Sequence, residues 1–305
     1  MPGKLTVLLC LMLCAHALQS QELQDTSTSS LPFHSSFPRQ APEASSYLHF
    51  LGNNLKYQAL APFKTKISKG TIYFATTIAV ALLREDRRLN HELRLVKEQS
   101  SLVHKSSSFI TTLGGYNGVL LLGGLGTYGA ITRNRKLSTT VMLASQSYIT
   151  SGIWAFILKI SLGRTRPDEY NHWTGPDRIF RPQDRHLTNL NEFNSFPSSH
   201  TTTAFSIASV FARQYKNKPI VGIGAYSMAT LVGLSRMTEN RHWGSDIIAG
   251  GLLGYLCGTA VVRNFEKRIS GTTNQASPWQ RILSRTTLTP VHDAYSSSLS
   301  LRYAL

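Results

Sequence analysis

Three short clusters of this 305-residue chain carry side chains that could hold a tetrahedral oxyanion and break one of its bonds. They span residues 159–167, 196–200 and 235–246. Together they contain a lysine, several arginines, two histidines, a carboxylate and small hydroxyl residues. Cations and backbone donors stabilise an oxyanion, and histidines attack an electrophile or transfer protons. The remaining sequence must provide the elements that position these groups.

The cations come from two of the clusters. Lys159 and Arg166 are seven residues apart, which on a helix is two turns and about 10 Å along one face. Pro167 disfavours helical geometry at Arg166, so the chain bends there and both charged heads can converge on one anion. Arg236 ends another predicted helix and can reach the same point. A guanidinium matches phosphate with two parallel hydrogen bonds, although each residue taken alone could equally be a solvated cation at a helix end.

The second cluster begins a predicted helix. Ser198 or Ser199 can cap this helix, and the free backbone N–H groups at a helix N-terminus bind anions. A serine before a helix is also an ordinary cap in any protein. The neighbouring His200 is the feature that favours a functional interpretation.

The third cluster pairs a histidine with a carboxylate. His242 and Asp246 are four residues apart, so on one helix face the carboxylate can accept a hydrogen bond from one imidazole nitrogen. This contact fixes the tautomer and leaves the other nitrogen as a nucleophile. A surface His–Asp pair is one alternative. A metal site formed by His200, His242 and Asp246 is another, but the three nearby cations would repel a metal ion.

The three clusters in order, Lys-x6-Arg-Pro, Pro-Ser-x-His and Ser-Arg-x5-His-x3-Asp, resemble the type 2 phosphatidic acid phosphatase superfamily. This superfamily also includes vanadium haloperoxidases and bacterial non-specific acid phosphatases. The short lysine-to-arginine spacing resembles the phosphatases, and we place the chain with their exported bacterial branch. The matching residues are Lys159, Arg166, Pro167, Pro197, Ser198, His200, Ser235, Arg236, His242 and Asp246.

The resemblance implies a role for each matching polar residue. His242 would attack phosphorus and form a phosphohistidine, Asp246 would orient His242, and His200 would protonate the leaving oxygen. The residues that would hold the phosphate are Lys159, Arg166, Ser198, Ser199 and Arg236. No metal and no other cofactor is implied, and vanadate would act only as an inhibitor. Ser199 stands where the family usually has glycine, and it can serve through its backbone N–H if its φ is not positive.

Apolar segments separated by short turns predict an all-α helical bundle. The predicted helices cover residues 71–83, 109–132, 138–158, 199–214, 219–234 and 244–262. The basic turn at 133–136 makes the second and third of these an antiparallel pair. We interpret the charged run 84–88 as a solvated helix end and the polar stretch 167–194 as a loop that covers the mouth of the pocket.

The composition divides the chain into four parts. Residues 1–20 have the positive start, short apolar core and A-x-A site of a secretory signal peptide, and residues 21–46 have the composition of a disordered linker. Residues 47–270 form the predicted phosphatase domain, in which Cys257 is a small core residue. Residues 271–305 form a C-terminal tail whose alternating pattern predicts a small β-hairpin.

The formal net charge of +16 favours an anionic partner. No basic stripe interleaved with aromatics indicates nucleic acid, so the predicted partners are a phosphate-ester substrate, lipid esters included, and a membrane surface.

The helices predicted at 71–83 and 200–212 are about 20 Å long, shorter than a bilayer core of about 30 Å. We therefore expect a soluble or peripheral protein, exported to a bacterial periplasm or cell envelope, rather than a multi-span membrane protein.

The functional hypothesis is a metal-independent phosphatase that hydrolyses a phosphate or diphosphate ester through a phosphohistidine. A haloperoxidase that uses vanadate as its cofactor would need nearly the same anion site. A non-catalytic envelope protein that binds an anion is the third hypothesis. Halide oxidation that requires vanadate would favour the second hypothesis, and phosphate binding without turnover would favour the third.

Overall fold

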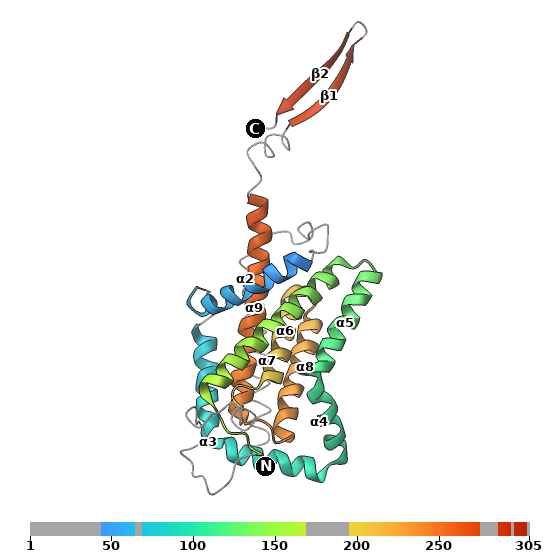
Figure 1. Ribbon diagram of the computed structural model, residues 1–305. Coiled ribbons are helices and arrows are strands. Elements are labelled where there is room, and N and C mark those ends of the chain that lie inside the picture. The colour runs from blue at the N-terminus through green and yellow to red at the C-terminus, as the bar shows by residue number, and fades with distance from the viewer. Residues whose placement is uncertain (1–43, 65–68, 169–194, 275–285, 294–295, 304–305) are drawn as a thin grey trace. The chain divides into compact units, whose positions relative to one another are not determined.

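The computed structural model describes residues 44–64, 69–168, 195–274, 286–293 and 296–303. These residues form eight helices and one antiparallel pair of strands (Figure 1). The helices are α2 (Ala44–Lys64), α3 (Lys69–Gln99), α4 (Ser101–Leu113), α5 (Tyr116–Ile131), α6 (Arg135–Leu162), α7 (Ser199–Gln214), α8 (Pro219–Thr238) and α9 (Gly244–Asn274). The chain forms two compact units, Met1–Val262 and Arg263–Leu305. The predicted all-α bundle is confirmed in the first unit.

The predicted hairpin is confirmed in the second unit. Strand β1 (Thr286–Asp293) pairs with β2 (Ser296–Tyr303) in antiparallel register. The signal peptide predicted for residues 1–20 lies outside the described residues. So does the linker predicted for residues 21–46, except that α2 already begins at Ala44.

Helix α7 lies at the centre of the bundle, packed between α6 and α8 (Figure 1). Helix α5 packs against α6, while α3 and α4 pack against α8. Alanines make up half of the buried core that α7 shares with α8 and α9, and they surround three aromatic rings, of which Phe205 and Tyr226 have centroids 6.0 Å apart. Small side chains let the helices approach closely, which favours van der Waals contact along their whole length.

A row of glycines on α9 brings this helix against α7. Gly250, Gly254 and Gly258 are four residues apart and therefore share one helix face. A Cβ at Gly254 would lie 2.2 Å from the carbonyl oxygen of Thr202, and one at Gly258 would lie 2.4 Å from that of Ser206. Because no side chain fits at these contacts, the glycines fix how α9 lies on α7.

The helix predicted for residues 109–132 is broken at Gly114 and Gly115. Helices α4 and α5 meet at this break with a bend of 59°. A Cβ at Gly114 would lie 2.7 Å from the carbonyl oxygen of His200. The glycine pair therefore allows the chain to turn in close contact with the first turn of α7.

A glycine also ends α6, four residues beyond the predicted end at 158 but before Arg166. Gly163 adopts the left-handed conformation (φ 54°, ψ 56°) and donates its N–H to the carbonyl oxygen of Lys159 at 3.1 Å. This is a common helix terminator. Lys159 therefore lies in the last turn of α6 and Arg166 lies beyond the helix, so the two do not share a helix face as expected.

Three of the described helices are long and apolar enough to cross a membrane: Arg135–Leu162, Pro219–Thr238 and Gly244–Ile269. The bent pair α4–α5 would add a fourth if it counts as one span. The prediction of a soluble or peripheral protein in a periplasm or cell envelope is therefore wrong, and a multi-span membrane protein replaces it. The prediction relied on helices of about 20 Å, whereas α6 has 28 residues and α9 has 31.

Candidate active site

The N-terminal ends of α7 and α9 meet at one end of the bundle. The N–H of Ser198 donates to the carbonyl oxygen of Asp246 at 3.2 Å, which links the two ends. The Ser198 hydroxyl caps α7, because its oxygen accepts from the N–H of Thr201 at 3.5 Å and from the Thr201 hydroxyl at 2.9 Å. The buried cap therefore fixes the position of the first turn of α7 and of its backbone N–H groups.

Ser199 and His200 form the first turn of α7. Ser199 has helical backbone and is not among the residues with positive φ, so serine fits without strain at the position where the resemblance implied glycine. The half-buried His200 side chain lies beside the break between α4 and α5. A Cβ at Gly115 would lie only 3.2 Å from its Nε2 atom, so the glycine leaves room for the imidazole.

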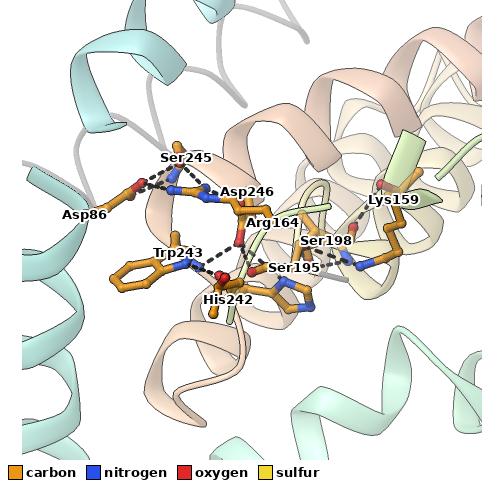
Figure 2. A network of polar contacts seen from close by, with 12 residues as sticks. Asp86, Lys159, Arg164, Ser195, Ser198, His242, Trp243, Ser245 and Asp246 are labelled. Atoms are coloured by element: carbon orange, nitrogen blue, oxygen red, sulfur yellow. Dashed lines mark hydrogen bonds and ion pairs between the residues drawn. The ribbon is translucent and has the colours of Figure 1, made fainter. Parts of the chain in front are cut away.

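Asp246 is fully buried and organises the groups around His242 (Figure 2). Its Oδ2 atom accepts hydrogen bonds from the Ser195 hydroxyl at 2.5 Å and from the N–H of Trp243 at 2.9 Å. The same oxygen lies 3.5 Å from Nδ1 of His242, a long contact. Because Nδ1 faces the carboxylate, Nε2 of His242 points away from it. The pair meets as predicted, although His242 precedes α9 rather than lying on it.

Arg164 connects this carboxylate to α3, and the sequence did not single it out. Its Nη1 donates to Oδ1 of Asp246 and, at 2.7 Å, to the Ser245 hydroxyl. Its Nη2 donates to Oδ2 of Asp86 at 2.8 Å. The guanidinium also lies over the ring of Trp243, 5.5 Å from the centroid. Arg164 is fully buried and is therefore part of the site's interior.

Asp86 completes the network from the middle of α3. Its Oδ1 accepts from the N–H of Ser245 at 2.9 Å, and its Oδ2 accepts from the Ser245 hydroxyl at 2.5 Å. Burial raises the pKa of Asp86, and the positive charge of Arg164 opposes that rise. The interpretation of residues 84–88 as a solvated helix end is therefore wrong for Asp86, because α3 continues to Gln99 and this side chain is buried.

Two of the predicted phosphate-binding cations are almost buried. Lys159 and Arg236 are each 8% exposed, and Nζ of Lys159 donates to the carbonyl oxygen of Ser195 at 3.4 Å. Nε of Arg236 has no hydrogen-bond partner among the described residues. Arg166 is half-buried. A buried guanidinium with a donor to spare suits an oxyanion, which accepts hydrogen bonds and balances the charge.

The cations act on both histidines. Burial, followed by the positive charges of Arg236, Lys159 and Arg166, lowers the pKa of His200 to about 4. Burial also holds the pKa of His242 well below its usual value. Lys159 and Arg236 lie close enough to oppose a positive charge on either histidine, and Arg166 opposes one on His200. At neutral pH His242 is uncharged, and its Nε2 lone pair is available to attack an electrophile.

Within the described part of the chain, no group of three His, Cys, Asp or Glu side chains is placed to hold a metal ion. The covering loop predicted for residues 167–194 lies outside the described residues except at its first two positions. There, Asp168 forms a partly exposed ion pair with Arg241 at 2.6 Å.

These features describe a helical protein in which two histidines and several cations lie at helix ends, a combination of side chains that suits an oxyanion. The family model of the PAP2 superfamily matches residues 138–270, which contain all three clusters. This part of the chain is therefore similar to the PAP2 superfamily, and the resemblance seen in the sequence is confirmed over these residues.

Individual relatives match over shorter stretches. The chain is 42% identical to the lipid A 1-phosphatase of Porphyromonas gingivalis over 66 residues, 21% of this chain and 15% of that protein. It is 29% identical to the probable diacylglycerol pyrophosphate phosphatase 1 of Schizosaccharomyces pombe over 161 residues, 45% of this chain and 57% of that protein. Each match thus covers less than two thirds of the relative's length.

A solved structure is also similar. It is the crystal structure of a transmembrane PAP2 type phosphatidylglycerolphosphate phosphatase from Bacillus subtilis, at 21% identity and a TM-score of 0.44. The alignment covers 73% of this chain and 96% of that one.

Proposed function

We propose that this protein hydrolyses the phosphate ester of a lipid, without a metal ion, through a phosphohistidine on His242. The observation that carries the proposal is the buried His242, whose Nδ1 lies 3.5 Å from Asp246 and whose pKa, like that of His200, is lowered by burial and by the nearby Lys159 and Arg236. An imidazole in this setting is a nucleophile whose electrophile is an anion, and phosphorus in a phosphate ester is such a centre.

In the first step, Nε2 of His242 attacks phosphorus and the P–O bond to the alcohol breaks. His200, protonated in the complex with substrate, gives its proton to the leaving oxygen. In the second step, His200 takes a proton from water, the hydroxide attacks phosphorus, and the P–N bond breaks. Inorganic phosphate leaves, and His242 returns to its uncharged form.

The negative charge on the transferring group is balanced by cations and backbone donors that are already in place. The proposed phosphate-binding residues are Lys159, Arg166, Ser198, Ser199 and Arg236. Ser198 and Ser199 contribute through the N–H groups at the start of α7, because the Ser198 hydroxyl already serves the cap. Asp246 stabilises the positive charge that His242 acquires.

Two observations favour a lipid substrate. The relatives named above are phosphatases of lipid A 1-phosphate and of diacylglycerol pyrophosphate, which share a phosphate or diphosphate on a membrane lipid. The helices that can cross a membrane keep the chain where such lipids are concentrated. A lipid phosphate monoester or diphosphate is therefore the proposed substrate class.

The test measures phosphate release by the purified chain in detergent, from mixed micelles of phosphatidic acid, diacylglycerol diphosphate or lipid A, with a chelator present. His242→Ala and His200→Ala should each nearly abolish turnover without changing the elution profile of the protein. His91→Ala is the matched control, because that histidine is exposed on α3. Vanadate should inhibit as an analogue of the transition state.

Rapid acid quenching during turnover of a ³²P-labelled substrate should not preserve a protein-bound label, whereas alkaline quenching should, because phosphohistidine is labile in acid. Near-normal rates in both histidine variants would overturn the mechanism. Halide oxidation that requires vanadate, or phosphate binding without turnover, would instead favour one of the two alternative functions.

A further inference from the structure

The buried network behind His242 contains one guanidinium and two carboxylates (Figure 2). Arg164 lies between Asp86 and Asp246 and donates to both. All three side chains are at most 1% exposed. Water therefore screens these charges poorly, and the balance among them acts strongly on the neighbouring imidazole.

The hydrogen bonds indicate that Asp86 is ionised. Both of its oxygens accept, Oδ1 from the N–H of Ser245 and Oδ2 from Arg164. The Ser245 hydroxyl accepts from Arg164 and can therefore direct its own hydrogen to Oδ2 of Asp86. Because every hydrogen-bonding neighbour of Asp86 is a donor, the ionised carboxylate, which only accepts, fits these contacts.

The charges have a direct consequence for the reaction. Arg164 carries one positive charge, which by itself would cancel the charge of Asp246. Asp86 balances Arg164, so the three side chains together keep one negative charge beside His242. That charge matches the single positive charge that His242 acquires when it bonds to phosphorus.

We propose that Asp86 is a positioning residue for the reaction: by pairing with Arg164, it leaves Asp246 with the charge that stabilises phosphorylated His242. The inference rests on the proposed function, because it requires His242 to become charged during turnover. Asp86 lies on α3, outside the segment that matches the family model. The network thus ties a helix outside that segment to the reacting imidazole.

A purely structural role is the competing explanation, since Asp86 also accepts the N–H of Ser245 at the start of α9. The two explanations differ in what a second substitution does. If the charge balance matters, removing the Arg164 charge together with the Asp86 charge restores one net negative charge. If only the hydrogen bonds matter, the second substitution adds further damage.

The experiment compares Asp86→Asn with Glu85→Gln, a matched loss of charge at the exposed neighbouring position. Asp86→Asn should lower kcat about ten- to hundredfold, as outer-layer partners of catalytic groups typically do, with KM nearly unchanged. Glu85→Gln should change neither. The double variant D86N/R164Q should have a higher kcat than Asp86→Asn alone, and Asp86→Glu, which keeps the charge, should retain more activity than Asp86→Asn.

Elution profile and thermal unfolding in detergent identify variants that fold. If D86N/R164Q does not fold, the comparison of Asp86→Glu with Asp86→Asn decides. The inference is overturned if Asp86→Asn matches Glu85→Gln, if the double variant is no better than Asp86→Asn, or if Asp86→Glu is as impaired as Asp86→Asn. Absence of turnover by the unsubstituted chain would count against the proposed function itself, and with it against this inference.

Discussion

Substrate binding must raise the pKa of His200 if this residue is to donate a proton near neutral pH. In the free site that pKa is about 4, so roughly one molecule in a thousand is protonated there at pH 7. Raising it to 7 requires about 4 kcal/mol, at 1.36 kcal/mol per unit. A pair of unit charges 4 Å apart contributes about 4 kcal/mol at an effective dielectric constant of 20. A phosphate dianion among the three cations is therefore sufficient.

The assay is the pH dependence of turnover, read separately as kcat/KM and kcat. The first reports ionisations of the free protein and the second those of its complex with substrate. Loss of the His200 proton should make kcat/KM fall as pH rises from about 4, whereas the same fall in kcat should begin at least about two units higher. The phosphate of the substrate also ionises, and its pKa is measured in the same micelles by ³¹P spectroscopy.

His200→Ala is the control, because it keeps the ionisation of the substrate and removes that of the residue. The residual activity of this variant should lack the fall in kcat. It should also lose less rate on an aryl phosphate, whose leaving group needs little protonation, than on a lipid phosphate. A fall at the same pH in kcat and kcat/KM, or one that persists in His200→Ala, would refute the assignment of His200 as the proton donor.

Two further predictions concern the packing that positions the site. Gly254→Ala should destabilise the protein by about 1–3 kcal/mol, because its Cβ would lie 2.2 Å from backbone of α7. Gly224→Ala, on α8 with nothing within 4 Å, should instead stabilise it by about 0.5–1 kcal/mol, and thermal unfolding in detergent measures both. Ser199→Gly should leave turnover within about twofold, because it keeps the backbone N–H and the serine already has helical φ; a large gain or loss in rate would show that the hydroxyl contributes.

The spacing of the three clusters located the candidate site because its residues lie at helix ends that meet in space. Lys159 and Arg236 lie in the last turns of α6 and α8, and His200 lies in the first turn of α7. The sequence placed each of them near a helix end. What the spacing could not supply was the geometry between clusters. The close contact of α7 with α9 depends on glycines such as Gly254, and a glycine gives no direct sign in the sequence of which helix it touches.

Asp86 and Arg164 were missed for different reasons. Asp86 lies in a run of five charged residues, 84–88, which is typical of a solvated surface. A helical period was nevertheless present, because Asp86, Leu89 and Asn90 have the spacing of one face and are all buried. Arg164 is one of the six residues between Lys159 and Arg166, and the Lys-x6-Arg pattern allows any residue at these six positions. Their contribution to the site becomes visible only in the structure, where Arg164 pairs with Asp86, 78 residues away in the sequence.

The threonines at the start of α7 are polar, but the structure shows that their hydroxyls are satisfied inside the protein and do not oppose a membrane location. Thr202 and Thr203 are buried, and their hydroxyls donate to the carbonyl oxygens of Ser198 at 2.9 Å and Gly114 at 2.6 Å. Large apolar side chains are instead exposed, including Leu120, Phe156 and Ile220. Because hydrocarbon offers no hydrophobic gain for burying apolar side chains, helices within it associate through small residues and polar contacts.

The placement of small and polar side chains inside the bundle, with large apolar ones on its surface, also affects the proposed chemistry. A core of hydroxyls and glycines lets the backbone of α7 lie close to that of α9, and the two helices begin at Ser199 and Gly244, next to the two histidines in the sequence. We expect the residues between these ends, such as Thr202, to influence the distance between His200 and His242 through the packing of α7 on α9. Substituting a bulkier residue there would separate the nucleophile from the proton donor, and proximity of reacting groups is itself a large part of the rate.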